Sequence, residues 1–224
     1  MFKILLFLLI SAVIILPQTA EAGGKVGIYG IRMEPDGEDA QNFSKPGWGG
    51  GIHVIAPFPQ LANFFAGTGG FEVINLMSRD RVFIDGTTGL RTEQQTSQNY
   101  YRIFLGGQVG GHGRGFIRPH IGSNIALVIY SINTDVVIPN DADPDNEIRQ
   151  DYATVTKSVF GWDITAGVDL NFANAWSIDL GVRYLKSFSL PQQLGEGSET
   201  VHPRYFQYYI GVGVSFKTIS RWGS

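Results

Sequence analysis

The sequence predicts an all-β protein: an eight-stranded antiparallel up-and-down transmembrane β-barrel with long extracellular loops and short periplasmic turns. Three observations predict this fold class. Apolar and polar residues alternate strictly along paired runs, the apolar faces of these runs carry aromatic residues at both ends, and the connections between runs alternate between long and short. None of these features depends on a single residue, so the prediction rests on the pattern of the whole chain.

The alternation is clearest between Val159 and Leu185, where two runs are separated by only residues 173–175. Because successive side chains of a strand point to opposite faces, each run is predicted to be a strand with one apolar and one polar face. Both runs are long enough to cross a bilayer, which takes roughly 9–11 residues in a tilted strand. Only a closed barrel lets strands cross lipid without unpaired backbone groups.

Alternation alone does not decide which face points outward, because a secreted β-sandwich buries its apolar face and a membrane barrel exposes it. Gly, Ser, Thr and Asp dominate the polar faces, which suits a crowded interior better than a wet surface. Charged residues make up 17% of the chain, below the usual value of about 25%. The aromatic residues at the strand ends are expected to form girdles at two membrane interfaces. These girdle residues are Trp48, Trp162, Phe172, Trp176, Tyr184, Phe206 and Phe216.

Eight segments show the strand pattern. In chain order they are residues 25–33, 48–57, 64–76, 99–111, 115–130, 159–172, 176–185 and 204–217. The first alternates least regularly. The next four carry on their apolar faces Trp48, Ile52 and Val54, then Phe71 and Val73, then Ile103 and Leu105, and then Ile121 and Ile125. The last carries Phe206, Tyr208, Ile210, Val212, Val214 and Phe216.

The connections alternate in length along the chain. The long polar connections are residues 34–47, 77–98, 131–156 and 189–203, and the short ones are 58–63, 112–114 and 173–175. An even number of strands with both termini in the periplasm places every long loop outside and every short turn inside, as in bacterial outer-membrane barrels. The alternation therefore predicts the topology as well as the strand number.

Residues 1–22 are predicted to be a cleaved signal peptide, which leaves a single barrel domain at 23–224. Lys3 is followed by an apolar run from Leu5 to Leu16 and then by Ala20-Glu21-Ala22, a small-residue cleavage pattern. A retained membrane helix is the alternative, but the run is short against the roughly 20 residues that such a helix needs. The chain has no cysteine, so no disulfide or cysteine metal site is expected. Its net charge of −3 indicates no nucleic-acid partner.

With these features the chain resembles the eight-stranded outer-membrane barrel family, the OmpA-type and OmpX-type β-barrel domains. The resemblance covers the export signal, the eight amphipathic strands, the loop asymmetry and the final strand from Phe206 to Phe216. It differs in the residues beyond Phe216, because the terminal aromatic usually closes the chain in the family. The resemblance implies an outer-membrane location, contact with outer-membrane lipid and lipopolysaccharide, and recognition by the barrel-assembly machinery.

The polar face predicts a plugged interior. Eight strands leave room only for side chains, and charges held there must pair because an unpaired buried ion costs several kcal/mol. The expected interior polar network contains Glu72, Arg102, Arg118, His120, Asp163, Asp169, Asp179 and Arg183. We therefore expect a structural or surface-interaction role, with an extracellular ligand bound by the loops, no cofactor and no enzymatic activity. A small gated channel for solutes is the main alternative.

A lipid-modifying enzyme is the second alternative, since His120 and Ser123 lie close together as in outer-membrane lipid A deacylases. Acyl hydrolysis needs a nucleophile within hydrogen-bond reach of a base. On a regular strand, residues three apart point to opposite faces, so this pair is not expected to work together.

The acidic segment 140–147 is a weak calcium candidate. Its alternating carboxylates resemble the oxygen-rich spacing of calcium loops, and the alternative is a solvated loop tip. The candidate ligands are Asp141, Asp143, Asp145 and Glu147.

Overall fold

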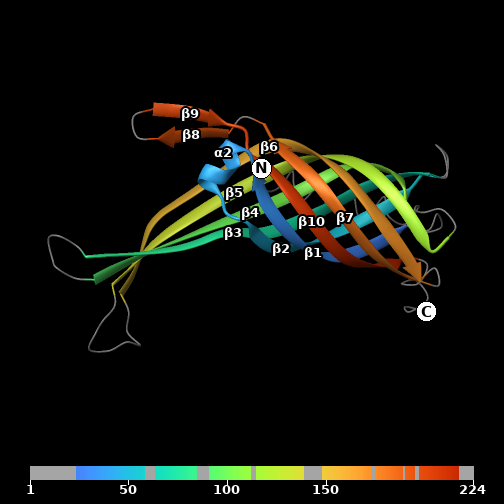
Figure 1. Cartoon of the computed structure of the whole chain (residues 1–224), viewed down its shortest axis with the longest axis horizontal. Helices are drawn as coiled ribbons and strands as arrows, with labels where there is room; N and C mark the ends of the chain where they lie inside the picture. Colours follow the sequence, from blue (N-terminus) through green and yellow to red (C-terminus); the bar gives the residue numbers. More distant parts are fainter. Residues whose placement is uncertain are drawn as a thin grey trace, which may run out of the picture.

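The computed structural model describes residues 24–58, 64–84, 91–111, 115–138, 148–172, 175–188, 190–194 and 197–216. The central feature is a closed antiparallel barrel of eight strands in the order β1-β10-β7-β6-β5-β4-β3-β2 (Figure 1). The strands are β1 (Lys25–Asp36), β2 (Gly47–Pro57), β3 (Phe65–Ile84), β4 (Arg91–Gly110), β5 (Ile117–Ile138), β6 (Ile148–Phe172), β7 (Trp176–Ser187) and β10 (Arg204–Ser215). Closure follows from β1, which pairs with both β2 and β10. The predicted fold class and strand number are confirmed.

The two ends of the barrel differ, as the loop lengths predicted. One end, here called the short-turn end, holds the start of β1, the end of β10 and the connections after β2, β4 and β6. The opposite end, the long-loop end, holds the connections after β1, β3, β5 and β7. At the short-turn end β4 leads into the turn through Gly110, whose φ of 88° is a left-handed conformation that favours glycine.

The apolar faces point away from the barrel. Ile28, Leu105 and Ile125 are each 66–67% exposed, and Ile210 is 59% exposed. A soluble β-sandwich would bury these side chains in its core, and monomeric soluble proteins rarely expose an apolar surface of more than a few hundred Å². The sandwich alternative is therefore excluded. The outward apolar side chains form a belt around the barrel, which has the character of a surface that contacts lipid.

Aromatic residues border this belt at both ends. At the long-loop end the Tyr184 ring lies between those of Trp162 and Phe206, with centroid distances of 6.3 and 5.2 Å. At the short-turn end Phe172 and Trp176 are direct cross-strand partners. Trp48 belongs to the long-loop end, where it is 66% exposed beside the Arg32 guanidinium, and half-buried Phe216 lies at the short-turn end. Phe206 and Phe216 are ten residues apart, which corresponds to a band about 25 Å high for a tilted strand.

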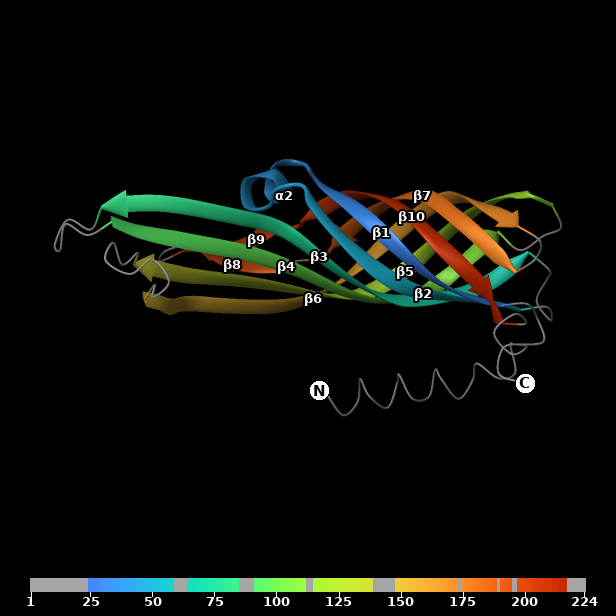
Figure 2. The same ribbon diagram turned by 90° about the horizontal axis from the view of Figure 1, so that it is seen from below.

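Four strands continue well beyond the barrel, which corrects the loop prediction for residues 77–98 and 131–156. β3 and β4 remain paired up to Ile84 and Arg91, and β5 and β6 up to Ile138 and Ile148 (Figure 2). The 25 residues of β6 span about 80 Å, far more than a bilayer requires. This extension, here called the outer sheet, comprises residues 77–84, 91–98, 131–138 and 148–158. The strict alternation that identifies the membrane strands is lost there, since Val82, Ile84 and Val155 are exposed and Val137 is buried, while backbone pairing continues.

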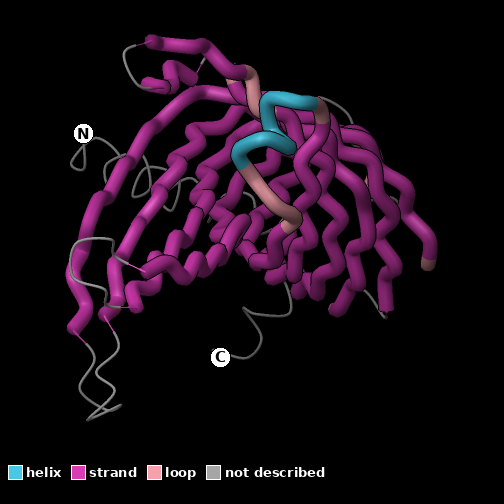
Figure 3. The backbone as a smooth tube through the Cα atoms, turned by 60° about the vertical axis from the view of Figure 1, so that its left-hand side comes forward, coloured by secondary structure: helices cyan, strands magenta, loops and turns pink. Residues whose placement is uncertain are grey.

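The other two long connections also contain regular structure that was expected to be loop. After β1 the chain forms helix α2 (Glu38–Phe43), which lies at the long-loop end (Figure 3). After β7 it forms the hairpin β8 (Leu190–Leu194) and β9 (Gly197–Val201). Ala40 of α2 is buried against the barrel interior, and the Ser44 and Tyr205 hydroxyls are 3.0 Å apart. The helix thus covers part of the long-loop end.

The predicted signal peptide and the residues after Phe216 lie outside the described residues. Across the parts of the chain that are described, no helix combines the length and the apolar character that a membrane span requires.

Candidate functional site

The barrel interior contains three successive groups of side chains, which we name from the short-turn end. The histidine layer comprises Lys25, His53, His120, Asp169 and Asp179. The ionic layer comprises Glu72, Arg102, Asp163 and Arg183. The tyrosine layer comprises Tyr100, Tyr130 and Tyr205 with Ile31, Met33, Ile74, Leu76, Val128 and Leu185, all at most 5% exposed.

Glu72 is the centre of the ionic layer. Its Oε1 accepts a hydrogen bond from Arg102 Nη1 at 2.9 Å and one from the Tyr29 hydroxyl at 2.7 Å, and it also pairs with Arg183 Nη1. Its Oε2 accepts from Gln207 Nε2 at 3.2 Å. Glu72 is completely buried, so these donors replace the water that the carboxylate loses on folding.

Asp163 is the second acid of the ionic layer. It pairs with Arg102 Nη2 and accepts hydrogen bonds from Asn124 Nδ2 at 2.8 Å and Thr165 Oγ1 at 3.1 Å. Two carboxylates therefore face two guanidiniums, and the layer carries no net charge. Both guanidiniums also lie over the Phe104 ring, 4.3 and 5.3 Å from its centroid. Glu72, Arg102 and Asp163 are at most 1% exposed, so bulk solvent does not contact these three side chains.

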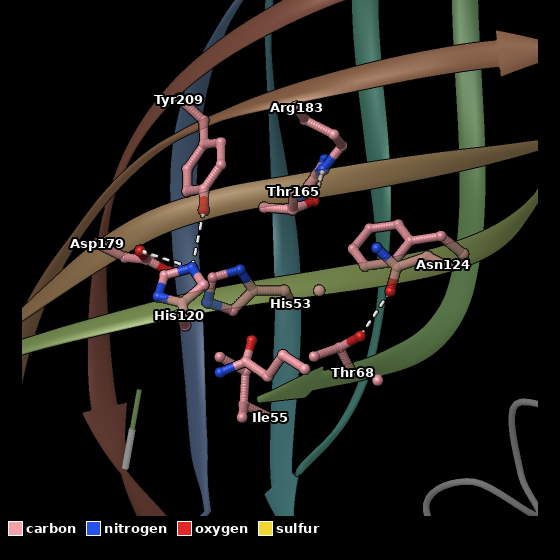
Figure 4. A pocket seen from close by; sticks show the side chains of 13 residues that line it. His53, Ile55, Thr68, His120, Asn124, Thr165, Asp179, Arg183 and Tyr209 are labelled. Atoms are coloured by element: carbon pink, nitrogen blue, oxygen red, sulfur yellow. Dashed lines mark hydrogen bonds and ion pairs between the residues drawn. The ribbon is translucent and has the colours of Figure 1, made fainter. Parts of the chain in front are cut away.

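The histidine layer is less completely paired. His120 Nε2 lies 3.2 Å from the Tyr209 hydroxyl and 3.7 Å from Asp179 Oδ1 (Figure 4). Asp169 is the direct cross-strand partner of Asp179, and its charge is compensated by Lys25 Nζ at 2.7 Å. A cavity of about 30 Å³ lies between this layer and Arg183 of the ionic layer, which is enough for one water molecule.

Glycines on the inward faces make room for these large side chains. A Cβ at Gly27 would lie 2.6 Å from His53 Nε2, and one at Gly167 would lie 2.7 Å from His120 Nε2. The high glycine content therefore reflects the space that an eight-stranded barrel must leave for buried aromatic rings and ionic groups.

The tyrosine layer closes the long-loop half of the barrel. Tyr100 packs edge-on against Tyr130 and Tyr205, with centroid distances of 5.3 and 5.9 Å. The Tyr130 hydroxyl lies 2.9 Å from Ser187 Oγ, so the rings are anchored by their polar ends. Sequence reasoning missed this layer, although Ile74 and Tyr100 share strand parity with Glu72 and Arg102 and so had to face inward.

The structure distributes the eight predicted interior residues over three places. Glu72, Arg102, Asp163 and Arg183 meet in the ionic layer, and His120, Asp169 and Asp179 meet in the histidine layer. Arg118 is half-buried at the short-turn end of β5, where its Nε donates to the Gly115 carbonyl at 3.0 Å. It therefore belongs to the rim and not to the buried layers.

Three further partners were missed by sequence reasoning. Tyr29 lies in the segment with the weakest alternation, and Lys25 is the first residue of that segment. Gln207 is completely buried between Glu72 and Arg183. A glutamine on a polar strand face does not indicate from sequence which groups it contacts. The role of Gln207 becomes clear only from the Glu72 carboxylate and the Arg183 guanidinium beside it.

The catalytic and metal alternatives find no assembled site among the described residues. Ser123 is on the outward face of β5 and its Oγ donates to the Asp163 carbonyl at 2.8 Å, whereas His120 is inside. The calcium candidates Asp141, Asp143, Asp145 and Glu147 lie outside the described residues. Within the described ranges, no group of three or more His, Asp or Glu side chains is placed to hold a metal ion.

No family model and no curated protein matches this sequence. Among solved structures, Neisserial surface protein A is similar with a TM-score of 0.53 at 12% identity, over 85% of this chain and 96% of that one. A major outer membrane protein from Thermus thermophilus also has a TM-score of 0.53, at 7% identity over 86% of this chain and 98% of that one. At these identities the likeness concerns the fold. The chain therefore has the architecture of the eight-stranded outer-membrane β-barrels, as the resemblance of its strand pattern implied.

Proposed function

We propose that this protein resides in the outer membrane of a Gram-negative-type bacterium as a closed barrel that anchors the outer sheet above the membrane surface. The observation that carries this proposal is the neutral, buried ionic layer, in which Glu72 and Asp163 are matched by Arg102 and Arg183. The tyrosine layer adds a second closed section. A barrel whose interior is filled by both the ionic and the tyrosine layer suits a membrane anchor for the outer sheet better than a channel for solutes.

The outer sheet is the part that presents a surface. Its strands carry hydroxyl side chains that contact one another across the sheet, such as Thr96 and Thr134 at 3.4 Å and Ser131 and Thr156 at 3.5 Å. Such cross-strand pairs contribute to the stability of the sheet. The proposed role is interaction with a ligand outside the cell through this sheet and the loops that join its strands.

Conductance tests the closed barrel. Purified protein in planar bilayers should give no stable single-channel steps, because moving an ion through the ionic layer would require separating buried ion pairs. Because the tyrosine layer closes the barrel independently, a triple Arg102→Ser, Arg183→Ser, Glu72→Ser variant that still shows the folded gel shift should not conduct either. Stable conductance of the wild-type protein would contradict the closed barrel and favour the gated-channel alternative, for which the histidine-layer cavity would be the starting point.

Orientation is tested by cysteine labelling, which is clean because the chain has no native cysteine. Thr156→Cys in the outer sheet should react with a membrane-impermeant maleimide on intact cells. Ala175→Cys at the short-turn end is the matched control and should react only after lysis. The reverse order would place the outer sheet in the periplasm and overturn the proposed surface role.

A further inference from the structure

An open hollow of about 400 Å³ lies on the outside of the barrel at the long-loop end. It is lined by Glu38, Lys186, His202 and Arg204, which come from α2, β7 and the residues on either side of the start of β10. The hollow is separate from the three interior layers and takes no part in closing the barrel.

Strand register places these cations directly above the aromatic girdle. Lys186 and Arg204 are direct cross-strand partners, and Tyr184 and Phe206 are the next outward-facing pair toward the membrane. Trp162 is the cross-strand neighbour of Lys186 on the other side. Aromatic girdles lie at headgroup level, so the two cations, one pair further out, lie at the outer part of the headgroup region, where lipid phosphates are within reach of their long side chains.

Both cations are available to a ligand. In the described part of the chain Lys186 forms no ion pair, and Arg204 Nε is 3.9 Å from Asp36 Oδ2, a loose contact made by an Arg204 side chain that is 43% exposed. Gly37, with φ of 77°, lies against the Arg204 guanidinium, and any Cβ at this position would collide with it. Among the described residues only Nε of the Arg204 guanidinium pairs with a carboxylate, so its outer nitrogens remain beside the hollow in the space that Gly37 leaves.

We propose that this hollow binds the phosphate of a lipid A-type glycolipid of the outer leaflet, with the phosphate on Lys186 and Arg204 and an acyl chain over Trp162, Tyr184 and Phe206. A phosphate monoester carries a charge of about −1.5 to −2 at pH 7, which two neighbouring cations match better than the single charge of a phosphodiester. The proposal depends on the outer-membrane location proposed above, but the binding itself can be measured in detergent.

The effect of replacing Glu38 on lipid affinity distinguishes direct phosphate binding from binding through a bridging divalent cation. Its carboxylate opposes a phosphate that binds directly to the cations, so Glu38→Gln should strengthen binding. If the phosphate instead bound through a bridging divalent cation, Glu38 would be a ligand of that cation and the same substitution would weaken binding. A weakened Glu38→Gln variant would therefore overturn direct binding to the two cations.

Native mass spectrometry of the full-length protein in detergent tests the site, with bisphosphorylated lipid A as the probe. We expect one bound lipid A, and a dissociation constant raised about fivefold by Lys186→Gln or Arg204→Gln alone and about 25-fold by both, since a cation near a membrane surface contributes about 1 kcal/mol. Arg32→Gln is the matched control. It removes a cation that lies beside Trp48, outside the hollow, and should leave the dissociation constant unchanged.

Three further ligands establish the class. Dephosphorylated lipid A, phosphatidylglycerol and inorganic phosphate should each bind at least tenfold more weakly than lipid A. Equal binding of phosphatidylglycerol would overturn the preference for a monoester, and equal binding of inorganic phosphate would overturn a lipid source. An equal effect of Arg32→Gln would show general charge attraction and no site. None of these outcomes alters the conductance or labelling results, so this proposal can fail while the closed surface barrel stands.

Discussion

Arg102 Nη1 lies 2.9 Å from Glu72 Oε1 in the centre of the barrel, and neither side chain is more than 1% exposed. Ion pairs in such surroundings are weak evidence for stability, because the loss of hydration offsets much of the attraction. Breaking one is different, since the remaining charge stays buried without its partner.

Arg102→Met should therefore lower the free energy of unfolding by about 3–5 kcal/mol, because it leaves Glu72 and Asp163 facing a single guanidinium. Urea titration in lipid vesicles, followed by the gel shift of the folded barrel, measures this change. Arg32→Met is the control: its partner Glu34 lies 3.4 Å away in an exposed pair, and its loss should cost no more than about 1 kcal/mol. Equal effects of the two substitutions would contradict the buried character of the ionic layer.

The inward-facing glycines predict that a larger side chain at these positions would collide with the buried residues beside them. Gly167→Val places a branched side chain where His120 Nε2 and the Leu180 carbonyl would each be 2.7 Å from the new Cβ, so we expect failure to fold or loss of several kcal/mol. Gly30→Val is the matched control on β1, where a new Cβ meets nothing within 4 Å, and it should fold normally. The fraction of heat-shifted protein after refolding distinguishes the two, and a folded Gly167→Val variant would show that the histidine layer is loosely packed.

A charged residue introduced on the outward face of the barrel tests whether lipid or water surrounds that face. Ile125 is 67% exposed on the outward face, so Ile125→Arg would be nearly neutral if water surrounded the barrel. In a bilayer it should cost about 2–4 kcal/mol near the midplane. Thr156→Arg on the outer sheet is exposed above the membrane and should change the free energy of unfolding by less than about 0.5 kcal/mol. Similar small values at both positions would contradict lipid contact.

The contact between Ser44 Oγ and the Tyr205 hydroxyl, 3.0 Å long and buried, joins the segment after α2 to the barrel. Ser44→Ala and Tyr205→Phe should each cost about 1 kcal/mol, since either leaves the partner hydroxyl buried. The double variant should cost less than the sum, because it removes both polar groups together. Strict additivity in a double-mutant cycle would show that the helix is not held by this contact.

The closed barrel, its strand number and the direction of its apolar face could all be predicted from the amino-acid pattern. Period-two alternation and loop length are local properties, and in a membrane barrel they have to match the bilayer. Glu72, Arg102, Asp163 and Arg183 could be assigned to the interior for the same reason, because strand parity alone places them there.

The division of the interior into layers and the ends of the long strands became visible only in three dimensions. Lys25 and Asp169 are far apart in sequence, and their 2.7 Å contact exists only because closure brings β1 near β6. The outer sheet could not be predicted from periodicity, because apolar and polar residues do not alternate strictly along its strands. The hollow beside α2 depends on Lys186 and Arg204 meeting across two strands. Strand register sets all of these relationships, and register follows from closure of the whole barrel, which no single segment encodes.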